Sequence, residues 1–368
     1  MIEIRKPTLV IDEIRVKNNI KRMVDRAKKS QVRFRPHFKT HQSALVGEWF
    51  RDLGISAITV SSLDMAQYFF SHNWDDITVA VPVNIRQIDI INSLAKSLTL
   101  HLLVESTDTA IFLKDTVKYP IKIWIEIDVD YGRSGIRWQN KEKIEELAQI
   151  IRKAEKLQLA GILTHAGQTY KAKCRKEIDQ IHDGSIRQMN DVKQYLLSKG
   201  FQNIEISVGD TPTCSISKNF EDVDEIRPGN FVFYDLQQVR LGSCEENDIA
   251  IAVACPIIGK YPYRNELVIY GGAIHLSKEF IERVDGSRSY GLIAVPTNNG
   301  WSKAVSNAFV SNLSQEHGII TADEAFIKER MIGEFLFVLP IHSCLTANLY
   351  KKYYSLKGQI IENIYSNK

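Results

Sequence analysis

Cysteine is scarce in this 368-residue chain, and long apolar runs are missing from it. Its cysteines are odd in number and widely scattered, which fits reduced thiols better than a framework of disulfides. No stretch approaches the roughly 18 apolar residues of a membrane span, and the first residues lack the apolar segment of a secretory signal. We therefore expect a cytoplasmic protein without a membrane partner, whose thiols are Cys174, Cys214, Cys244, Cys255 and Cys344.

An excess of one charge is missing as well. The 47 Lys and Arg residues nearly balance the 44 Asp and Glu residues, which leaves a net charge of +3, and neither sign forms a long block. This pattern predicts no nucleic-acid arm and no membrane-surface patch. The ordinary hydrophobic content of 44% and the length allow one large α/β domain or two unequal domains.

The first two thirds of the chain alternate between short β-rich runs and amphipathic segments. Strands alternating with helices imply a parallel sheet, and eight such units favour a closed (β/α)8 barrel. The predicted strands are Val32–Pro36, Ser56–Val60, Ile77–Val81, Thr99–Val104, Ile121–Ile127, Leu159–Thr164, Ile204–Val208 and Glu225–Arg227, the last continuing toward Phe233. The predicted helices are Lys17–Lys29, Gln42–Asp52, Leu63–His72, Arg86–Ala95, Lys141–Lys156 and Ile186–Ser198.

The last third contains β-branched runs with fewer helical periods, which predicts a second, mainly antiparallel β domain. We expect the barrel to span residues 13–240 and the β domain to comprise residues 1–12 and 241–368. The strand predicted over Pro7–Ile11 could join either domain. The predicted strands of the second domain are Ile249–Ile258, Leu267–Tyr270, Gly291–Val295 and Phe335–Leu339.

Unusual polar residues follow four of the predicted barrel strands. Active sites of such barrels lie at the carboxyl ends of the strands, where the loops converge. Four loops would therefore contribute to one site. The residues concerned are Lys39, Asp128, Asp130, Arg133, His165, Gln168, Tyr170, Ser207, Gly209, Asp210 and Thr211.

Five motifs, taken together and in order, resemble the fold-type III pyridoxal-phosphate enzymes, and among them the branch of D-serine dehydratases and D-threonine aldolases. The resemblance covers nearly the whole chain. It implies an N-terminal barrel, a C-terminal β domain and a homodimer in which each protomer completes its partner's site. The motifs are Arg35–His41, His165–Gly167, Ser207–Pro212, Arg227–Asp235 and Pro340–Cys344.

The resemblance assigns residues to each part of pyridoxal 5'-phosphate. Lys39 matches the lysine that forms the imine, and we expect burial and the charge of Arg35 to favour its reactive neutral amine. Arg133 matches the partner of the ring nitrogen, although Asp130 stands where the family usually has glycine. Tyr170 is expected against the ring or the phosphate. The turns matched to the phosphate contribute Ser207, Gly209, Asp210, Thr211, Gly229 and Asn230, with the hydroxyl of Tyr234 as a further donor.

The pair His342 and Cys344 predicts a metal site. Residues two apart on a β-strand point to the same face, so the two side chains could hold one ion. Imidazole and thiolate suit Zn2+, with Mn2+ as the alternative, and the pair falls where D-serine dehydratases carry their zinc ligands. Two protein ligands leave positions open for the substrate hydroxyl.

The predicted activity is that of a D-serine dehydratase, in which Lys39 removes the α-proton and the metal draws off the β-hydroxyl, giving a 2-oxo acid and ammonia. A D-threonine aldolase is the alternative. That branch pairs the metal histidine with aspartate and has a histidine near Gln168, whereas this chain has Cys344 and glutamine. An amino-acid racemase would need a tyrosine base that we cannot identify, and a non-catalytic carrier would lack the second domain. No fixed role is assigned to His37, His41 or His275.

Overall fold

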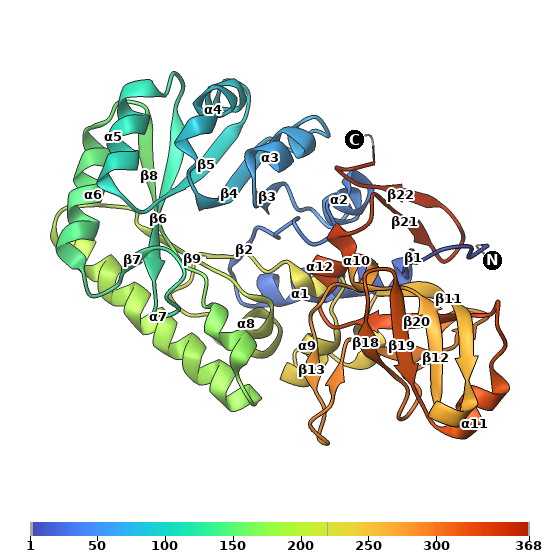
Figure 1. The fold of residues 1–368 in the computed structure, drawn as a ribbon. Helices are drawn as coiled ribbons and strands as arrows, with labels where there is room; N and C mark the ends of the chain where they lie inside the picture. The colour runs from blue at the N-terminus through green and yellow to red at the C-terminus, as the bar shows by residue number, and fades with distance from the viewer. Residues whose placement is uncertain (1–2, 219, 367–368) are drawn as a thin grey trace. The chain divides into compact units, whose positions relative to one another are not determined.

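A computed structural model of the chain describes residues 3–218 and 220–366. They form two compact units (Figure 1). The barrel unit comprises residues 22–39 and 47–229, and the β unit comprises the described residues of 1–21, 40–46 and 230–368. Helices α1 (Glu13–Lys29) and α2 (Ala44–Arg51) each contain residues of both units.

The barrel unit contains a parallel sheet that closes on itself. Its strand order is β2-β10-β9-β8-β6-β5-β4-β3. The ring closes where the chain after β2 meets β3, because Phe38 N donates to Thr59 O and Thr59 N donates to Pro36 O. The predicted closed barrel is therefore confirmed. The strands are β2 (Arg33–Phe34), β3 (Ala57–Val60), β4 (Asp76–Pro82), β5 (Thr99–Val104), β6 (Ile121–Asp128), β8 (Leu157–Leu163), β9 (Glu205–Val208) and β10 (Glu225–Ile226), with the short β7 (Ile136–Arg137) beside β6.

Helices alternate with these strands, and Figure 1 shows α5, α6 and α7 along the outer side of the barrel strands. Each buries one stripe; α6, for example, buries Ile144, Leu147 and Ile151. The sequence did not predict α5, in which only Ala110 and Leu113 are buried. The helices are α3 (Leu63–Phe70), η1 (Ile85–Gln87), α4 (Ile88–Ala95), α5 (Thr107–Thr116), α6 (Lys141–Lys153), η2 (Gly167–Lys171), α7 (Arg175–Ser198) and α8 (Thr211–Ile216).

The last barrel strand is shorter than predicted. It ends at Ile226, and the chain from Asn230 to Val232 is a 3-10 turn, η3, instead of a continued strand. Pro228 has no N–H to offer a neighbouring strand, which explains why the ladder stops.

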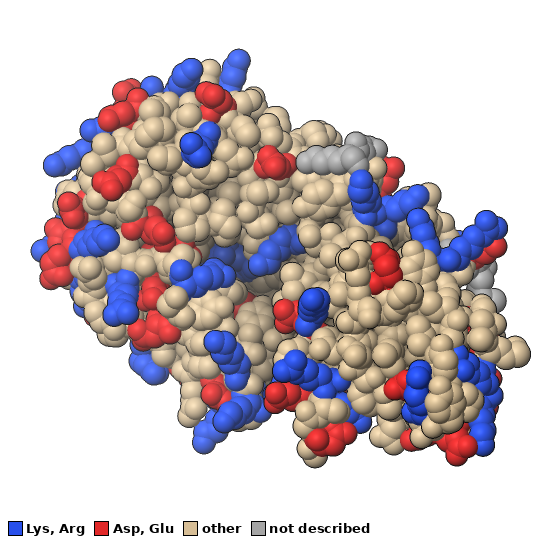
Figure 2. All heavy atoms as spheres, viewed as in Figure 1, with Lys and Arg blue, Asp and Glu red and all other residues tan. Residues whose placement is uncertain are grey.

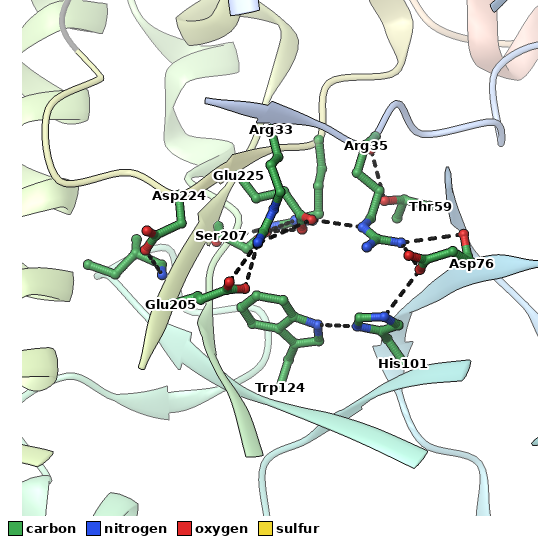
Figure 3. A network of polar contacts seen from close by, with 12 residues as sticks. Arg33, Arg35, Thr59, Asp76, His101, Trp124, Glu205, Ser207, Asp224 and Glu225 are labelled. Atoms are coloured by element: carbon green, nitrogen blue, oxygen red, sulfur yellow. Dashed lines mark hydrogen bonds and ion pairs between the residues drawn. The ribbon is translucent and has the colours of Figure 1, made fainter. Parts of the chain in front are cut away.

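Charged side chains gather at the amino ends of the barrel strands (Figure 3). Arg35 donates through Nε to Glu225 at 2.8 Å and through Nη1 to Asp76 at 2.5 Å. His101 Nε2 lies 3.2 Å from Asp76, while its Nδ1 accepts from Trp124 Nε1 at 3.0 Å. The charges of Arg35 are thus compensated inside the barrel, at the end opposite to the polar loops.

The β unit contains a nine-stranded sheet of order β12-β19-β18-β15-β20-β11-β1-β21-β22. Strand β1 (Thr8–Ile11) is antiparallel to β11 and parallel to β21, so the strand that could have joined either domain lies in this sheet. All other pairings in the sheet are antiparallel. The remaining members are β11 (Ile251–Tyr261), β12 (Glu266–Tyr270), β15 (Gly291–Ala294), β18 (Phe309–Leu313), β19 (His317–Thr321), β20 (Phe335–Pro340), β21 (Lys352–Ser355) and β22 (Ile360–Glu362).

The core of this sheet contains Val10, Ala252, Trp301 and Phe337, all buried. The shorter elements of the β unit lie between its strands in the sequence. They are α9 (Leu236–Leu241), η4 (Glu246–Asp248), η5 (Pro262–Arg264), α10 (Ala273–Leu276), α11 (Glu324–Glu329), α12 (Ser343–Asn348) and the hairpins β13 (Ile281–Glu282) with β14 (Arg288–Ser289) and β16 (Pro296–Thr297) with β17 (Gly300–Trp301).

Charges of both signs are interspersed over the faces of the two units that are in view (Figure 2). Over the described ranges, no helix is both long and apolar enough to cross a bilayer. None of the five cysteines forms a disulfide, as their scattered positions predicted.

Candidate active site

Positive charge converges on a neutral histidine at the carboxyl ends of the barrel strands. His165 follows β8, and its Nδ1 donates to the carbonyl of Gly209 at 2.7 Å. Burial and the positive charges of Arg133, Lys39 and Arg227 together lower the pKa of His165 to about 3, against the hydrogen bond to Gly209, which raises it. Three positively charged side chains thus act on an uncharged imidazole, an arrangement that suits an anionic group such as a phosphate.

Lys39 lies in the loop after β2 and reaches this cluster from an exposed position. Its side chain is exposed, and Arg35 is turned into the buried network with Glu225 and Asp76. The expectation that the amine is buried is therefore wrong. The ammonium nevertheless lies close enough to His165 to influence its pKa.

The turn after β9 is held in shape by its own side chains. A Cβ at Gly209 would lie 2.7 Å from the backbone nitrogen of Arg227, so only glycine fits there. The buried carboxylate of Asp210 caps α8 by accepting from Thr213 N at 2.7 Å and also accepts from Thr169 Oγ1 at 2.9 Å. Asp210 therefore shapes the turn.

Tyr170 adjoins the same turn. Thr211 N donates to the Tyr170 hydroxyl at 3.3 Å, and the Tyr170 ring centroid is 6.2 Å from that of His165. Both residues thus lie beside the cation cluster, where the Tyr170 hydroxyl can donate to an anion.

Ser207, a predicted site residue, forms a buried pair with Arg227, which the sequence does not predict. Arg227 Nε donates to Ser207 Oγ at 2.7 Å, and Ser207 Oγ donates to Glu225 at 2.7 Å. Burial lowers the pKa of Arg227 to about 10. The Ser207 hydroxyl is therefore engaged by these two side chains, and Arg227 is a further candidate site residue, which the sequence indicates only as part of the motif Arg227–Asp235.

The loop after β6 keeps the shape that glycine would give it. Asp130 has a φ of 67°, the left-handed conformation that aspartate tolerates better than most residues. Its Oδ2 accepts from Gln188 Nε2 at 2.7 Å and from Trp138 Nε1 at 3.3 Å. The departure from the family's glycine therefore leaves the backbone in a conformation typical of glycine.

Arg133 comes from this loop and lies 4.0 Å from Glu126. Burial raises the pKa of Glu126, whose carboxylate accepts from Ser134 Oγ at 2.8 Å. The motifs do not single out Glu126. The sequence nevertheless carries a signal, because Lys122, Trp124, Glu126 and Asp128 occupy every second position of β6, with isoleucine at the positions between them.

The two predicted metal ligands lie at the start of a helix, and the expectation that they sit on a strand is wrong. Strand β20 ends at Pro340, His342 is the cap residue of α12, and Cys344 lies in its first turn. Their side chains nevertheless form a hydrogen bond with each other. Burial alone would lower the pKa of His342, but this hydrogen bond and the charges of Cys344, Asp235 and Glu279 raise it to about 9. Within residues 3–218 and 220–366, no group of three His, Cys, Asp or Glu side chains forms a metal site.

The residues after Gly229 are tied to this helix start. Asn230 Nδ2 donates to Asp235 Oδ2 at 2.6 Å and to Ser343 Oγ at 3.0 Å. Tyr234 is buried and has a φ of 48°, which is rare for an aromatic residue and often marks a functional position. The side chain of Asn230 thus belongs to the network around the predicted metal ligands.

The remaining polar residues are held by local contacts. Gln168 Nε2 donates to Val129 O at 3.0 Å. Burial lowers the pKa of His41 to about 3, and its Nδ1 accepts from Ser43 N at 3.1 Å. His275 lies 4.0 Å from Glu316, and His37 Nδ1 accepts from Lys39 N at 3.4 Å.

Comparison with known families agrees with this architecture. Residues 11–237 match the alanine racemase N-terminal domain, and residues 250–356 match a serine dehydratase domain. The first match covers more than half of the chain. The chain therefore belongs to the fold-type III pyridoxal-phosphate family that contains the D-serine dehydratases.

Individual relatives narrow the comparison. A D-serine dehydratase of Dictyostelium discoideum is 31% identical over 98% of this chain and 95% of its own. A solved structure of D-threo-3-hydroxyaspartate dehydratase from Delftia is 27% identical, with a TM-score of 0.89 over 99% of this chain and 98% of that one. Another structure of that dehydratase is a cysteine-to-alanine mutant in the metal-free form. D-threonine aldolase from Filomicrobium marinum shares the fold, with a TM-score of 0.82 at 18% identity.

Proposed function

We propose that this chain is a pyridoxal-phosphate- and metal-dependent dehydratase that converts a small β-hydroxy D-amino acid to a 2-oxo acid and ammonia, with D-serine as the leading substrate. The observation that carries the proposal is the convergence of Lys39, Arg133 and Arg227 on neutral His165. Such a cluster suits both a phosphate and the carboxylate of an amino acid. The D-serine dehydratase relative supports the choice of substrate.

The residues present fit the cofactor. Lys39 provides an accessible amine for covalent attachment, and the turn at Gly209 and Thr211 offers backbone donors beside Tyr170. Residues Gly229, Asn230 and Tyr234 would supply the second phosphate turn through backbone N–H groups and a hydroxyl. Ser207 and Asp210 then act by holding Arg227 and the α8 turn in place.

When bound, pyridoxal phosphate supplies an electron-withdrawing ring for the α-carbon, and the metal supplies a Lewis acid for the β-hydroxyl. In this proposal Lys39 Nζ accepts the α-proton. Arg133 would hold the ring nitrogen by donating a hydrogen bond to it. His165 remains uncharged and offers no competing acid.

His342 and Cys344 would hold the metal. The contact between their side chains and the soft donor set of imidazole and thiolate fit Zn2+ better than a hard-oxygen metal. Hydroxide is a poor leaving group, which gives the metal its task. The metal-free form described for the related dehydratase supports a metal in this branch of the family.

Product analysis tests the activity. We would incubate purified protein with D-serine, D-threonine and D-threo-3-hydroxyaspartate, and measure 2-oxo acid, ammonia, glycine and aldehyde before and after chelation. We expect 2-oxo acid and ammonia in equal amounts, and their loss after thorough chelation. Glycine and aldehyde without 2-oxo acid would make the chain an aldolase instead.

We also propose that the chain acts as a homodimer, which the family resemblance implies. Sedimentation of the purified protein checks this. A monomer with full activity would contradict it.

A further inference from the structure

The sulfur of Cys344 has two polar neighbours within the β unit besides His342. Thr40 Oγ1 lies 3.1 Å from Cys344 Sγ, and Asn230 Nδ2 lies 3.6 Å from it. Thr40 is 0% exposed and Asn230 is 5% exposed, so water does not readily replace these contacts. Thr40 directly follows Lys39, and Asn230 directly follows Gly229. Both neighbours therefore come from segments that the proposed function assigns to the cofactor.

We propose that Thr40 and Asn230 are positioning residues of the metal site: they hydrogen-bond the Cys344 sulfur and hold it at the place where it binds the ion. This inference rests on the proposed function, since it requires His342 and Cys344 to bind a metal.

The chemistry of the bound state fixes the direction of the Thr40 contact. A cysteine that binds a metal is a thiolate and carries no proton. The hydroxyl of Thr40 must then be the donor, and its free rotation allows this. Hydrogen bonds to a charged acceptor are stronger than neutral ones, so the contact gains strength when the metal binds.

The orientation of Asn230 is fixed by Asp235, which is fully buried. Asp235 Oδ2 accepts from Asn230 Nδ2 at 2.6 Å and from Ser343 N at 2.9 Å. A flipped amide would place its oxygen against this carboxylate, so the nitrogen must face it. The second hydrogen of Nδ2 is then directed at Ser343 Oγ and at the Cys344 sulfur, at 3.0 and 3.6 Å.

Asp235 therefore accepts hydrogen bonds both from the amide of Asn230 and from the backbone nitrogen of Ser343, the residue before Cys344. The sulfur is positioned from three sides, by its own helix turn, by Thr40 and by Asn230. Removing a hydrogen bond to a metal ligand typically weakens metal binding by about 10–100-fold. We expect an effect of this size from the loss of the Thr40 hydroxyl.

Metal affinity of the full-length protein tests the inference. Thr40→Val removes the hydroxyl and keeps the shape, and Thr40→Ser restores the hydroxyl. Thr346→Val is the matched control. Thr346 lies in α12, the helix that contains Cys344, and it is as buried as Thr40. Its hydroxyl donates to the carbonyl of Leu276 and not to the sulfur. Zn2+ binding would be measured by competition with a chromophoric chelator, and Co2+ binding by the thiolate-to-cobalt charge-transfer band.

We expect Thr40→Val to weaken Zn2+ binding by about 10–100-fold and to shift the cobalt band. Thr40→Ser should recover most of the affinity, and Thr346→Val should change only thermal stability. The amount of bound pyridoxal phosphate should be the same in all variants.

Three negative results are distinguishable. If the parent protein binds Co2+ without a charge-transfer band, Cys344 is not a ligand, and both the proposed metal site and this inference are wrong. If the parent shows the band but Thr40→Val leaves both affinity and band unchanged, only this inference is wrong. An equal loss of affinity in Thr346→Val would show that general destabilisation is the cause and would also overturn it.

Discussion

Lys39 is the residue on which the proposed chemistry depends most directly. Its exposed amine lies near neutral His165 and the cations Arg133 and Arg227. We expect Lys39→Ala to abolish covalent attachment of pyridoxal phosphate, measured as the mass gained after borohydride reduction. Lys28→Ala, another exposed lysine of the barrel unit, is the control and should gain the full mass. Unchanged labelling of Lys39→Ala would mean that another amine holds the cofactor.

Cys344 offers a second test at the level of one atom. A metal that assists departure of the β-hydroxyl contributes several kcal/mol, so we expect Cys344→Ala to lower turnover of D-serine by about 100-fold or more. Added Zn2+ should not restore it. Cys174→Ala, an exposed thiol of the barrel unit, should retain full turnover. Full activity of Cys344→Ala would remove the sulfur from the mechanism.

Residue types and motif order predict the site only in part. Lys39, Arg133 and the Gly209 turn could be chosen because their chemistry is distinctive after a strand. Arg227 belongs to one of the motifs, but its position near His165 depends on the pairing of β9 with β10. No pattern within either segment of the sequence predicts that pairing. The contacts of Asp235 with Ser343 and of Thr40 with Cys344 join residues 108 and 304 positions apart, which a single sequence cannot bring together.

Secondary structure was predictable where one face of an element is clearly buried. The predicted strand Thr99–Val104 coincides with β5, and five of its six residues are buried. Helix α5 has few buried side chains, and its sequence therefore carried a weak signal. The sequence predicts a strand at His342 and Cys344 because a pair of residues two apart looks the same at the end of a strand and at the start of a helix. Only Pro340, at the end of β20, indicates that the strand stops before this pair.

The paired charges at the amino ends of the barrel strands predict a dependence of stability on pH. The side chain of Glu225 is 1% exposed, and although burial alone would raise its pKa, the charge and hydrogen bond of Arg35 hold it below the ordinary value. A carboxyl whose pKa is lower in the folded state than in the unfolded state stabilises the folded protein at pH values above its unfolded pKa of about 4.3. This stabilisation is lost as the pH falls through the folded pKa.

We therefore expect Glu225→Gln to lower the free energy of unfolding by about 3–5 kcal/mol at pH 7, because it removes the buried negative charge that pairs with Arg35 and leaves the partly exposed Asp76 as the other carboxylate bound to it. The difference from the parent should shrink below about pH 4. Denaturant unfolding over a range of pH values measures this, with exposed Glu142→Gln as the control. A difference that stays constant down to acid pH would show that Glu225 contributes through shape alone.

On the scale of the whole molecule, the β unit is assembled from distant parts of the chain. Strand β1 lies between β11 and β21 in the sheet, so its removal would leave two inner edges without partners. We expect a fragment of residues 230–368 to stay unfolded, as judged by circular dichroism. The same fragment with residues 3–12 fused ahead of it through a flexible linker should recover strand signal. A folded fragment without β1 would show that the sheet tolerates the gap.

The central place of β1 also has a consequence for biosynthesis. The apolar segment Thr8–Ile11 leaves the ribosome long before its neighbour β21 (Lys352–Ser355) is made. At roughly 5–20 residues per second, the interval is some tens of seconds. During that time an apolar strand with an unpaired edge is open to pairing with other polypeptides. A chaperone that binds short hydrophobic segments would find a binding site in Thr8–Ile11.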